Sequence, residues 1–384
     1  MGLYLNPGNR AFQMVLNSKI YIDKSEMISL INSVVDTENR FICVSRPRRF
    51  GKSVTANMLV AYYSCGCDSS ELFSHLKISG DTDYKKHLNQ YNVIHLNMTE
   101  FINGVDTMSG ILDNLSKRLL HELKKVFGAV NCYDWNDLIS VFREIFEEKQ
   151  VPFVFVIDEW DCVFREYKDN VEYQKDYLDF LRNMLKDQNY VALTYMTGIL
   201  PIKKYGKHSA LNMFTEISMT DVREYAKFTG FTQEEVEMLC QEYNMPFEET
   251  RQWYDGYNLR GVSVYNPRSV VMSMTGGYFN NYWTATETYE ALKVYIEMNF
   301  DGLREKIIRM ISGGAEKINI GKFQNDMTTF KSADDVLTLL VHLGYLSYDF
   351  DNACVKIPNS EVQQEFINSI EDGGWESVIE KIKK

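Results

Sequence analysis

One stretch constrains the fold of this chain more than any other. An apolar, β-branched run over residues 41–45 leads through a turn rich in Arg and Pro into Gly51-Lys52-Ser53, and apolar residues at helical spacing follow. This order predicts a phosphate-binding loop, because unpaired backbone N–H groups and the positive end of the helix dipole meet at a helix start. We expect Lys52 to reach the β- and γ-phosphates and the Ser53 hydroxyl to ligate Mg²⁺.

The loop departs from the usual phosphate-loop pattern at its first position, where Gly is expected and this chain has Arg46. A side chain is unfavourable there if the backbone needs a positive φ. Guanidinium groups, however, bind phosphate in a bidentate fork. A structural turn with a solvated basic face is the alternative. The residues expected to contact the nucleotide are Arg46, Pro47, Arg48, Arg49, Phe50, Gly51, Lys52, Ser53 and Val54.

A second apolar run, over residues 151–157, ends in Asp158-Glu159-Trp160-Asp161. A run that is apolar on both faces is typical of a central parallel strand, and ligands bind beyond the carboxyl ends of such strands. We expect Asp158 to hold Mg²⁺, usually through water, and Glu159 to be the base that polarises the attacking water. A strand that ends in solvated acids is the alternative, and the Gly-Lys-Ser loop earlier in the chain argues against it.

A third run, over residues 190–196, ends in Thr197 and a glycine. A polar residue at this place can sense a γ-phosphate, and a plain cap between strand and loop is the alternative. Lys52, Glu159 and Thr197 are therefore the expected catalytic residues. With a strand candidate over residues 92–98 and helical patterns between the strands, the order predicts an α/β fold with a mostly parallel sheet.

The pattern after residue 205 is mainly helical. Helix starts are expected at Thr220 and, with a capping box, at Thr232. The aromatic clusters around Trp253 and Tyr265 indicate packing between domains, and the chain closes as helix, two short strands around a turn, and helix. We expect a P-loop ATPase domain over residues 1–205, a helical lid over 206–300 and a winged-helix-like domain over 301–384.

Composition limits the class of protein. The formal net charge of -12 argues against a surface built to coat nucleic acid, because neutralisation of phosphates supplies non-specific affinity. The 7 cysteines, an odd number in a long chain, fit a reducing compartment rather than a disulfide framework. No signal-peptide pattern and no apolar run of roughly 20 residues is present, so we expect a cytoplasmic protein that does not enter membranes.

These stretches together resemble the bacterial AAA-ATPase-like family, a group of predicted AAA-ATPases related to AAA+ and STAND NTPases. In that family an arginine at the first loop position is itself the pattern, so Arg46 becomes part of the match. The matching residues lie in order along nearly the whole chain: Tyr21–Ser25, Arg46–Ser53, Ile157–Asp161, Thr197-Gly198, Gly230–Thr232, Glu234–Val236, Trp253–Tyr257, Tyr265–Pro267, Tyr282-Trp283, Gly344–Leu346, Ile357–Asn359 and Glu361-Val362.

The resemblance implies an AAA-like ATPase with ATP and Mg²⁺ as cofactors. It also indicates two departures. Many members continue into a C-terminal nuclease-like domain of the PD-(D/E)XK type, which we expect this sequence, ending at Lys384, to lack. Arg268 stands where the family has Trp, which leaves the role of that position open.

We therefore expect an ATP-binding and ATP-hydrolysing switch protein. The alternative is a scaffold that holds nucleotide without cycling, or a regulatory subunit of a nuclease or defence-type nucleic-acid system. The expected partners are the nucleotide, a second copy of the chain and a nuclease-like effector. The sequence does not assign the arginine that completes catalysis, which comes from Arg46, Arg48 or Arg49 in cis or from a neighbouring subunit, and it does not decide between ATP and GTP.

Overall fold

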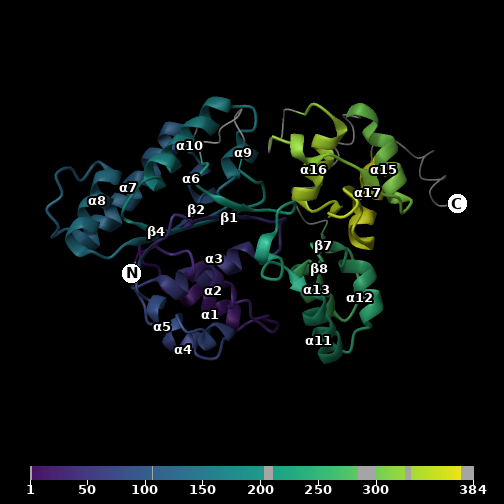
Figure 1. The fold of residues 1–384 in the computed structure, drawn as a ribbon, viewed down its shortest axis with the longest axis horizontal. Helices are drawn as coiled ribbons and strands as arrows, with labels where there is room; N and C mark the ends of the chain where they lie inside the picture. Colours follow the sequence, from purple (N-terminus) through teal and green to yellow (C-terminus); the bar gives the residue numbers. More distant parts are fainter. Residues whose placement is uncertain (1, 106, 203–210, 284–299, 325–329, 373–384) are drawn as a thin grey trace. The chain divides into compact units, whose positions relative to one another are not determined.

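The structure is a computed structural model that describes residues 2–105, 107–202, 211–283, 300–324 and 330–372 (Figure 1). It divides into two compact units. The first unit comprises Met1–Val44 and Lys52–Glu216, and the second comprises Ser45–Gly51 and Ile217–Lys384. The expected boundary at residue 205 lies outside the described residues. The second unit contains the expected C-terminal domain and the expected lid from Ile217 onward, so the three-domain division stays a prediction.

The first unit is built on a five-stranded sheet in the order β2-β3-β4-β1-β5. The β2–β3 and β3–β4 pairs are parallel, and the strand order confirms the predicted α/β class. Every residue of β3 is buried, as the continuous apolar run predicts for a central strand. The strands are β1 (Phe41–Ser45), β2 (Asn92–Asn97), β3 (Phe153–Asp158), β4 (Val191–Gly198) and β5 (Thr215–Ile217).

Helices cover both faces of this sheet, with α1–α5 on one side and α6–α10 on the other (Figure 1). The long helix α7 buries a stripe of leucine and isoleucine spaced by about one turn, and its Thr107 N-cap accepts a hydrogen bond from the Gly110 N–H. The helices are α1 (Arg10–Leu16), α2 (Met27–Asn32), α3 (Lys52–Tyr63), α4 (Ser70–Phe73), α5 (Tyr84–His87), α6 (Thr99–Ile102), α7 (Met108–Phe127), α8 (Leu138–Lys149), α9 (Cys162–Glu166) and α10 (Val171–Leu185), with a 3₁₀ helix at Lys77–Gly80.

The second unit is mainly helical, with two small sheets in the orders β6-β8-β7 and β10-β11-β9. Its helices are α11 (Gln233–Tyr243), α12 (Phe247–Tyr254), α13 (Pro267–Gly276), α15 (Leu303–Ile311), α16 (Ala333–Leu343) and α17 (Ser360–Asp372), with 3₁₀ helices at Arg223–Tyr225, Phe300–Gly302 and Ile320–Lys322. Its strands are β6 (Phe231–Thr232), β7 (Tyr257–Leu259), β8 (Val262–Tyr265), β9 (Glu316–Lys317), β10 (Ser347–Asp349) and β11 (Cys354–Lys356).

Two predicted helix starts in this unit have different outcomes. The capping box at Thr232 is confirmed, since the Thr232 N–H donates to a Glu235 carboxylate oxygen at 2.8 Å and the Glu235 N–H donates to the Thr232 hydroxyl oxygen. The α-helix expected from Thr220 is wrong, because only a short 3₁₀ helix forms there. The Ser218 hydroxyl accepts the N–H groups of Thr220 and Asp221, and this local turn competes with helix formation.

The C-terminal part follows the predicted order of helix, hairpin and helix. Helix α16 carries a capping box at Ser332, and the antiparallel β10–β11 hairpin separates it from α17. Strand β9 adds a third strand beside β11. This arrangement confirms the winged-helix-like reading of the fold class.

The turn that contains Gly256 is held closely against residue 358. Gly256 has a φ of +112°, and a Cβ built on it would lie 2.0 Å from the Pro358 carbonyl oxygen. We expect Gly256→Ala to destabilise the second unit by roughly 3 kcal/mol, because backbone strain and a clash add. Denaturant unfolding followed by tryptophan fluorescence measures this loss.

Gly261→Ala is the matched control for that substitution. Gly261 also has a positive φ, +90°, but a Cβ there would meet nothing within 4 Å. It should therefore show the cost of backbone strain alone. Equal destabilisation by the two substitutions would contradict the close packing at Gly256.

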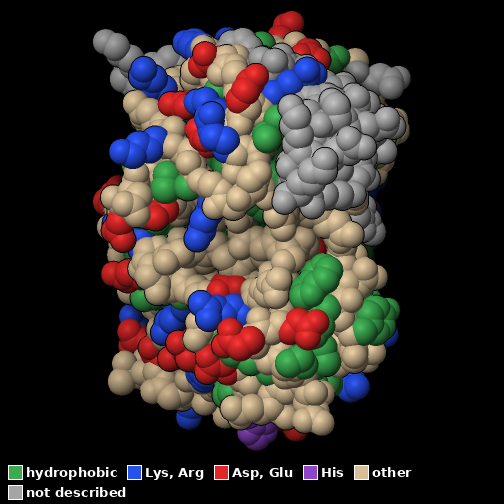
Figure 2. Space-filling view, turned by 90° about the vertical axis from the view of Figure 1, so that its right-hand side faces the viewer, with side chains coloured by type: hydrophobic (Ala, Val, Ile, Leu, Met, Phe, Trp, Pro, Cys, Tyr) green, Lys and Arg blue, Asp and Glu red, His purple; other side chains and the backbone are tan. Residues whose placement is uncertain are grey.

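The surface carries charges of both signs. On the visible part of the face in Figure 2, acidic and basic side chains lie beside one another rather than in separate fields. Among the helices of the described ranges, none combines the length and the apolar character that a membrane crossing requires.

Candidate functional site

The predicted phosphate loop leads directly into helix α3, which begins at Lys52. Its residues divide between the two units, because Ser45–Gly51 belong to the second unit and the chain from Lys52 belongs to the first. The two groups of residues are therefore described separately. The order of strand, loop and helix is the one that the sequence predicts.

In the first unit the sheet register aligns three polar strand ends. Asn97 of β2 is the cross-strand neighbour of Asp158 of β3, and Asp158 is the neighbour of Thr197 of β4. Parallel strands place these residues at the same edge of the sheet, the edge where α/β proteins bind ligands. Asn97 is an addition to the predicted set, and its side-chain oxygen accepts the N–H of Thr99.

Lys52 is buried, with 5% of its surface exposed, and three carboxylates surround its charge. Burial lowers the Lys52 pKa, and the negative charges of Glu159, Asp161 and Asp158 oppose that effect. The structure therefore brings Lys52 together with both acids that the sequence assigned to the site. A cation at this position suits the neutralisation of phosphate oxygens.

Asp158 and Ser53 form a pair of oxygen donors. Burial raises the pKa of the Asp158 carboxyl, and a hydrogen bond with the Ser53 hydroxyl and the charge of Lys52 oppose the shift. The Glu159 N–H also donates to an Asp158 oxygen at 2.9 Å. Hydroxyl and carboxylate oxygens are the ligands that Mg²⁺ takes, so this pair fits the ion that the family implies.

The Mg²⁺ ion of phosphate sites needs few protein ligands. It usually keeps several waters and is bound through one or two protein oxygens together with substrate phosphates. Within the described ranges, no group of three or more His, Cys, Asp or Glu side chains is arranged to hold a metal ion. The Ser53–Asp158 pair corresponds to the sparse ligand set of such sites.

Glu159 lies directly after β3 in a left-handed backbone conformation, with a φ of 52°. Such a conformation is unfavourable for a residue with a side chain and is often found at functional positions. The Glu159 Oε2 oxygen forms an ion pair with the Arg165 guanidinium. Burial raises the Glu159 pKa and the Arg165 charge opposes it, which leaves a carboxyl suited to accept a proton.

Asp161 and Arg165 are site residues to which the sequence analysis gave no role. Asp161 is fully buried, and its Oδ2 accepts the N–H groups of Ile199 at 3.1 Å and Leu200 at 2.9 Å. The Arg165 Nε lies 3.4 Å from the same oxygen. Asp161 and Arg165 are four residues apart at the start of α9, and this spacing in the sequence could have indicated their ion pair.

Asp161 is expected to be essential for the stability of the first unit. Asp161→Ala should cost roughly 3 kcal/mol, because it removes the acceptor of two buried N–H groups and the partner of Arg165. Asp161→Asn keeps an acceptor oxygen and should cost less than half as much. Urea unfolding of both variants measures the difference, and equal losses would contradict the role of the acceptor.

Thr197 is buried at the end of β4, and its hydroxyl donates to the Val44 carbonyl oxygen at 2.9 Å. This hydrogen bond joins the ends of β4 and β1. It corresponds to the alternative that the sequence left open for Thr197, a plain cap between strand and loop. Contact of Thr197 with a γ-phosphate stays a prediction.

The loop residues in the second unit are held by specific contacts. Arg46 is fully buried; its Nε donates to the Thr229 hydroxyl oxygen at 2.8 Å and its Nη1 to the Ser45 carbonyl oxygen at 2.9 Å. The Gly230 N–H donates to the Phe50 carbonyl oxygen at 3.1 Å. The side chain that replaces the expected glycine thus anchors the loop.

The condition under which a side chain at Arg46 would be unfavourable, a positive φ, does not hold at that residue. Arg46 is not among the positive-φ residues, whereas Arg49 has a φ of 68° and Gly51 a φ of 85°. The Arg49 Nη1 donates to the Tyr282 carbonyl oxygen at 2.8 Å. Burial lowers the Arg49 pKa, and the charges of Arg268 and Arg48 act in the same direction.

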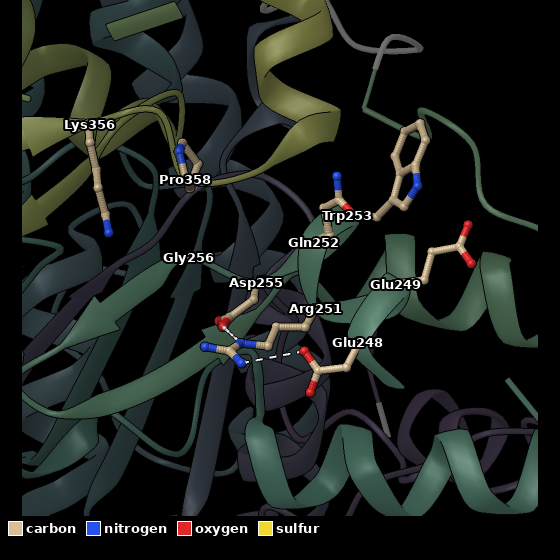
Figure 3. Close-up of a pocket in the computed structure, with 9 residues that line it drawn as sticks. All are labelled: Glu248, Glu249, Arg251, Gln252, Trp253, Asp255, Gly256, Lys356 and Pro358. Carbon is tan, nitrogen blue, oxygen red and sulfur yellow. Dashed lines mark ion pairs between the residues drawn. The ribbon is translucent and has the colours of Figure 1, made fainter. Parts of the chain in front are cut away.

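The second unit also has an open cavity of about 840 Å³ beside the Gly256 turn (Figure 3). Arg251 lies between Glu248 and Asp255 there, at 3.6 and 3.8 Å. Exposed ion pairs of this kind contribute little to stability. The lining residues are Glu248, Glu249, Arg251, Gln252, Trp253, Asp255, Gly256, Lys356 and Pro358.

Comparison with known proteins gives a family match for the N-terminal half. The model of a family described as predicted AAA-ATPase matches residues 8–207, more than half of the chain. An uncharacterized protein in the vnfD 5′ region of Azotobacter chroococcum mcd 1 is 26% identical over 255 residues, which cover 64% of this chain and 47% of that protein. The chain thus spans about half the length of this curated relative.

Two solved structures show distant likeness to this chain. Cdc6p from Pyrobaculum aerophilum aligns with 91% of this chain and 93% of its own at 9% identity, with a TM-score of 0.28. The Aeropyrum pernix ORC2 protein, in its ADPNP-ADP complexes, aligns with 95% and 98% at 10% identity, with a TM-score of 0.34. These TM-scores are too low to assign a fold from the alignments, and the fold assignment depends on the order of the strands in the sheet.

Proposed function

Because the chain belongs to the predicted AAA-ATPase family, we propose that it binds Mg-ATP at the loop of residues 46–54 and hydrolyses it. The observation that carries this proposal is the arrangement in the first unit. Lys52, at the start of α3, lies with Asp158 and Glu159 at the carboxyl end of a buried parallel strand. A buried cation beside a metal-binding acid and a base is the equipment that phosphoryl transfer to water requires.

The residues have distinct roles in the proposed reaction. Lys52 neutralises the β- and γ-phosphates, and Ser53 and Asp158 would hold Mg²⁺, which spreads the charge that develops on the phosphate oxygens. Glu159 accepts a proton from the attacking water as the oxygen bonds to the γ-phosphorus and the bond to ADP breaks. The contact of Arg165 with Oε2 orients the carboxylate, so that Oε1 accepts the proton.

The remaining predicted contacts belong to the same proposal. The loop from Arg46 to Val54 surrounds the phosphates, and Thr197 senses the γ-phosphate. Arg46 serves as an anchor, which its two hydrogen bonds support. A second copy of the chain supplies the arginine that completes catalysis, and a nuclease-like effector reads the nucleotide state.

The ion pair between Glu159 and Arg165 favours one alternative. A base held by a cation is a weaker proton acceptor, and the protein would then bind nucleotide without turning it over until a partner releases Glu159. In that case the chain acts as a scaffold or as a regulatory subunit of a nucleic-acid system. The same site residues bind the nucleotide under either function.

Mg-ATP turnover across a wide range of protein concentration tests the proposal, with Lys52→Ala as the blank. The proposal predicts turnover that the blank lacks, with a specific activity that rises with concentration as copies associate. Turnover that persists in the blank would contradict it. Bound nucleotide without turnover at every concentration would instead support the scaffold.

A further inference from the structure

A buried carboxylate at the start of helix α17 makes a set of hydrogen bonds for which the proposed reaction has no use. Glu361 is 1% exposed, and its oxygens accept the Ser269 hydroxyl at 2.9 and 3.0 Å. Its Oε1 also accepts the Tyr282 N–H at 2.7 Å. Burial of an acid is unfavourable unless hydrogen bonds compensate it, and the shared Ser269 hydroxyl and the Tyr282 N–H do so.

The residue between Glu361 and the phosphate loop is Tyr282. Its N–H donates to Glu361, while its carbonyl oxygen accepts the Arg49 guanidinium at 2.8 Å. Arg49 therefore connects to α17 through the two polar backbone groups of one residue. The negative charge of Glu361 also favours the charged form of Arg49, and so opposes the lowering of the Arg49 pKa by burial.

The carboxylate has a fixed position in the second unit. The Asn359 side chain donates to the Asp255 carbonyl oxygen at 2.7 Å and accepts the Val362 N–H at 3.0 Å. Gly256 packs against the Pro358 carbonyl oxygen beside the cavity of Figure 3. The start of α17 is thus attached on both sides, so Glu361 can act as a fixed point for the Arg49 side chain.

The charge balance favours anion binding near Arg49. Among the described residues, the charges that act on its pKa are those of the cations Arg48 and Arg268 and of the anion Glu361. Two neighbouring cations and one anion leave an excess of positive charge around a guanidinium group. A polyphosphate is the anion that a loop of this sequence is expected to bind.

We propose that Glu361 is a positioning residue which, through Tyr282, holds Arg49 in the conformation that binds nucleotide phosphate. This inference rests on the proposed function and adds a regulatory connection to it. Helix α17 controls the affinity of the loop for polyphosphate. Displacement of α17 by an effector would release Arg49 and with it the nucleotide.

The protonation of Glu361 should make the phosphate affinity of the loop depend on pH. Burial raises the Glu361 pKa to about 7, against the hydrogen bonds from Tyr282 and Ser269. Above that pH the carboxylate is charged and attracts Arg49; below it the attraction is lost, so phosphate affinity falls as the pH falls through 7. In the part of the chain that the structure describes, the other ionisable groups that interact with Glu361 are Glu365 on its own helix, Arg49, Tyr254, Tyr257 and Tyr282.

Glu365 is the only one of those neighbours besides Glu361 that titrates in the acid range. Arg49 stays charged and the three tyrosines stay neutral, because burial raises the pKa of each tyrosine. Glu365→Gln is therefore the matched control. It removes an equally buried carboxyl, bonded to Asn281, on the next turn of the same helix.

The test is the affinity of the full chain for Mg-ATP, measured by calorimetry between pH 5.5 and 8.5. Glu361→Gln should bind about tenfold more weakly than the wild type at pH 8 and about equally at pH 5.5, where the wild-type acid is also neutral. The protonation of ATP also changes with pH, but it affects both proteins equally. The ratio of the wild-type affinity to the Glu361→Gln affinity at each pH is therefore independent of it. Glu365→Gln should keep the wild-type affinity at pH 8, with its fall in affinity moved to lower pH, because the Glu365 charge contributes to the raised Glu361 pKa. Thermal unfolding checks that all variants fold.

Arg49→Ala supplies the second arm of the experiment. In its background Glu361→Gln should have no further effect on affinity, because the residue that Glu361 positions is gone. An equal loss of affinity at pH 5.5 and pH 8, or an undiminished loss in the Arg49→Ala background, would overturn the inference. A wild type that binds no ATP would instead overturn the proposed function.

Discussion

Glu159→Gln is expected to reduce ATP turnover by about 10²- to 10⁴-fold while leaving ATP affinity within about threefold of the wild type. The amide keeps the shape of the side chain but cannot accept the proton of water. Lys52, Ser53 and Asp158 are unchanged, so the groups proposed to hold the phosphates and Mg²⁺ remain. Steady-state phosphate release and calorimetric ATP binding measure the two quantities.

Glu166→Gln is the matched control for this substitution. Glu166 is the last residue of α9 and is exposed, so loss of its charge should leave turnover unchanged. Wild-type turnover should be lost as the pH falls and Glu159 becomes protonated. Because the Glu159 pKa is raised, this loss should begin at a higher pH than an ordinary glutamate would give. Full turnover by Glu159→Gln would show that Glu159 is not the base.

Lys52→Ala is expected to weaken Mg-ATP binding by at least about 100-fold. Two effects act in the same direction. The substitution removes the cation proposed to neutralise the phosphates, and it leaves Asp158, Glu159 and Asp161 with less compensating charge, so that they repel the ligand. Equilibrium binding of a fluorescent ATP analogue measures the loss.

Lys52→Met and Lys52→Arg separate charge from packing at this buried position. Methionine fills the volume of the lysine stem without a charge and should bind as poorly as alanine. Arginine restores the charge and should recover part of the affinity. Wild-type affinity in a folded Lys52→Met variant would contradict the assignment of Lys52.

Much of the first unit follows from its sequence. The apolar run before Asp158 predicts a central strand, and all six residues of β3 are buried. The helical pattern between the second and third strand candidates predicts the helix that the structure has at Met108–Phe127. In both segments the hydrophobic pattern and the local propensity agree, so little depends on contacts from distant residues.

Two of the features that the sequence did not predict depend on long-range contacts. The role of Asp161 is defined by the N–H groups of Ile199 and Leu200, which lie after another strand. Arg46 is buried because Thr229 accepts its hydrogen bond, and no local pattern indicates that partner. The difference at Ser218 is local instead, because the Ser218 hydroxyl binds the N–H groups of the next residues and a turn forms where a helix was expected.

Long-range contacts also explain why only part of the site was predicted. Two short motifs at the ends of strands and helices were predictable, because the topology of the sheet brings such ends together. They contain Lys52, Ser53, Asp158 and Glu159. The Glu361–Tyr282–Arg49 connection joins three segments far apart in the chain. Only the folded second unit shows it.

The central claim is that this chain binds Mg-ATP through Lys52 and the acids after β3. Calorimetric titration of Mg-ATP into the full-length wild type and into Lys52→Ala, with folding of both checked by circular dichroism, tests it most directly. The account predicts one ATP bound per wild-type chain and binding lost in Lys52→Ala. A folded wild type that binds no ATP, or a Lys52→Ala variant that binds it equally well, would contradict the account.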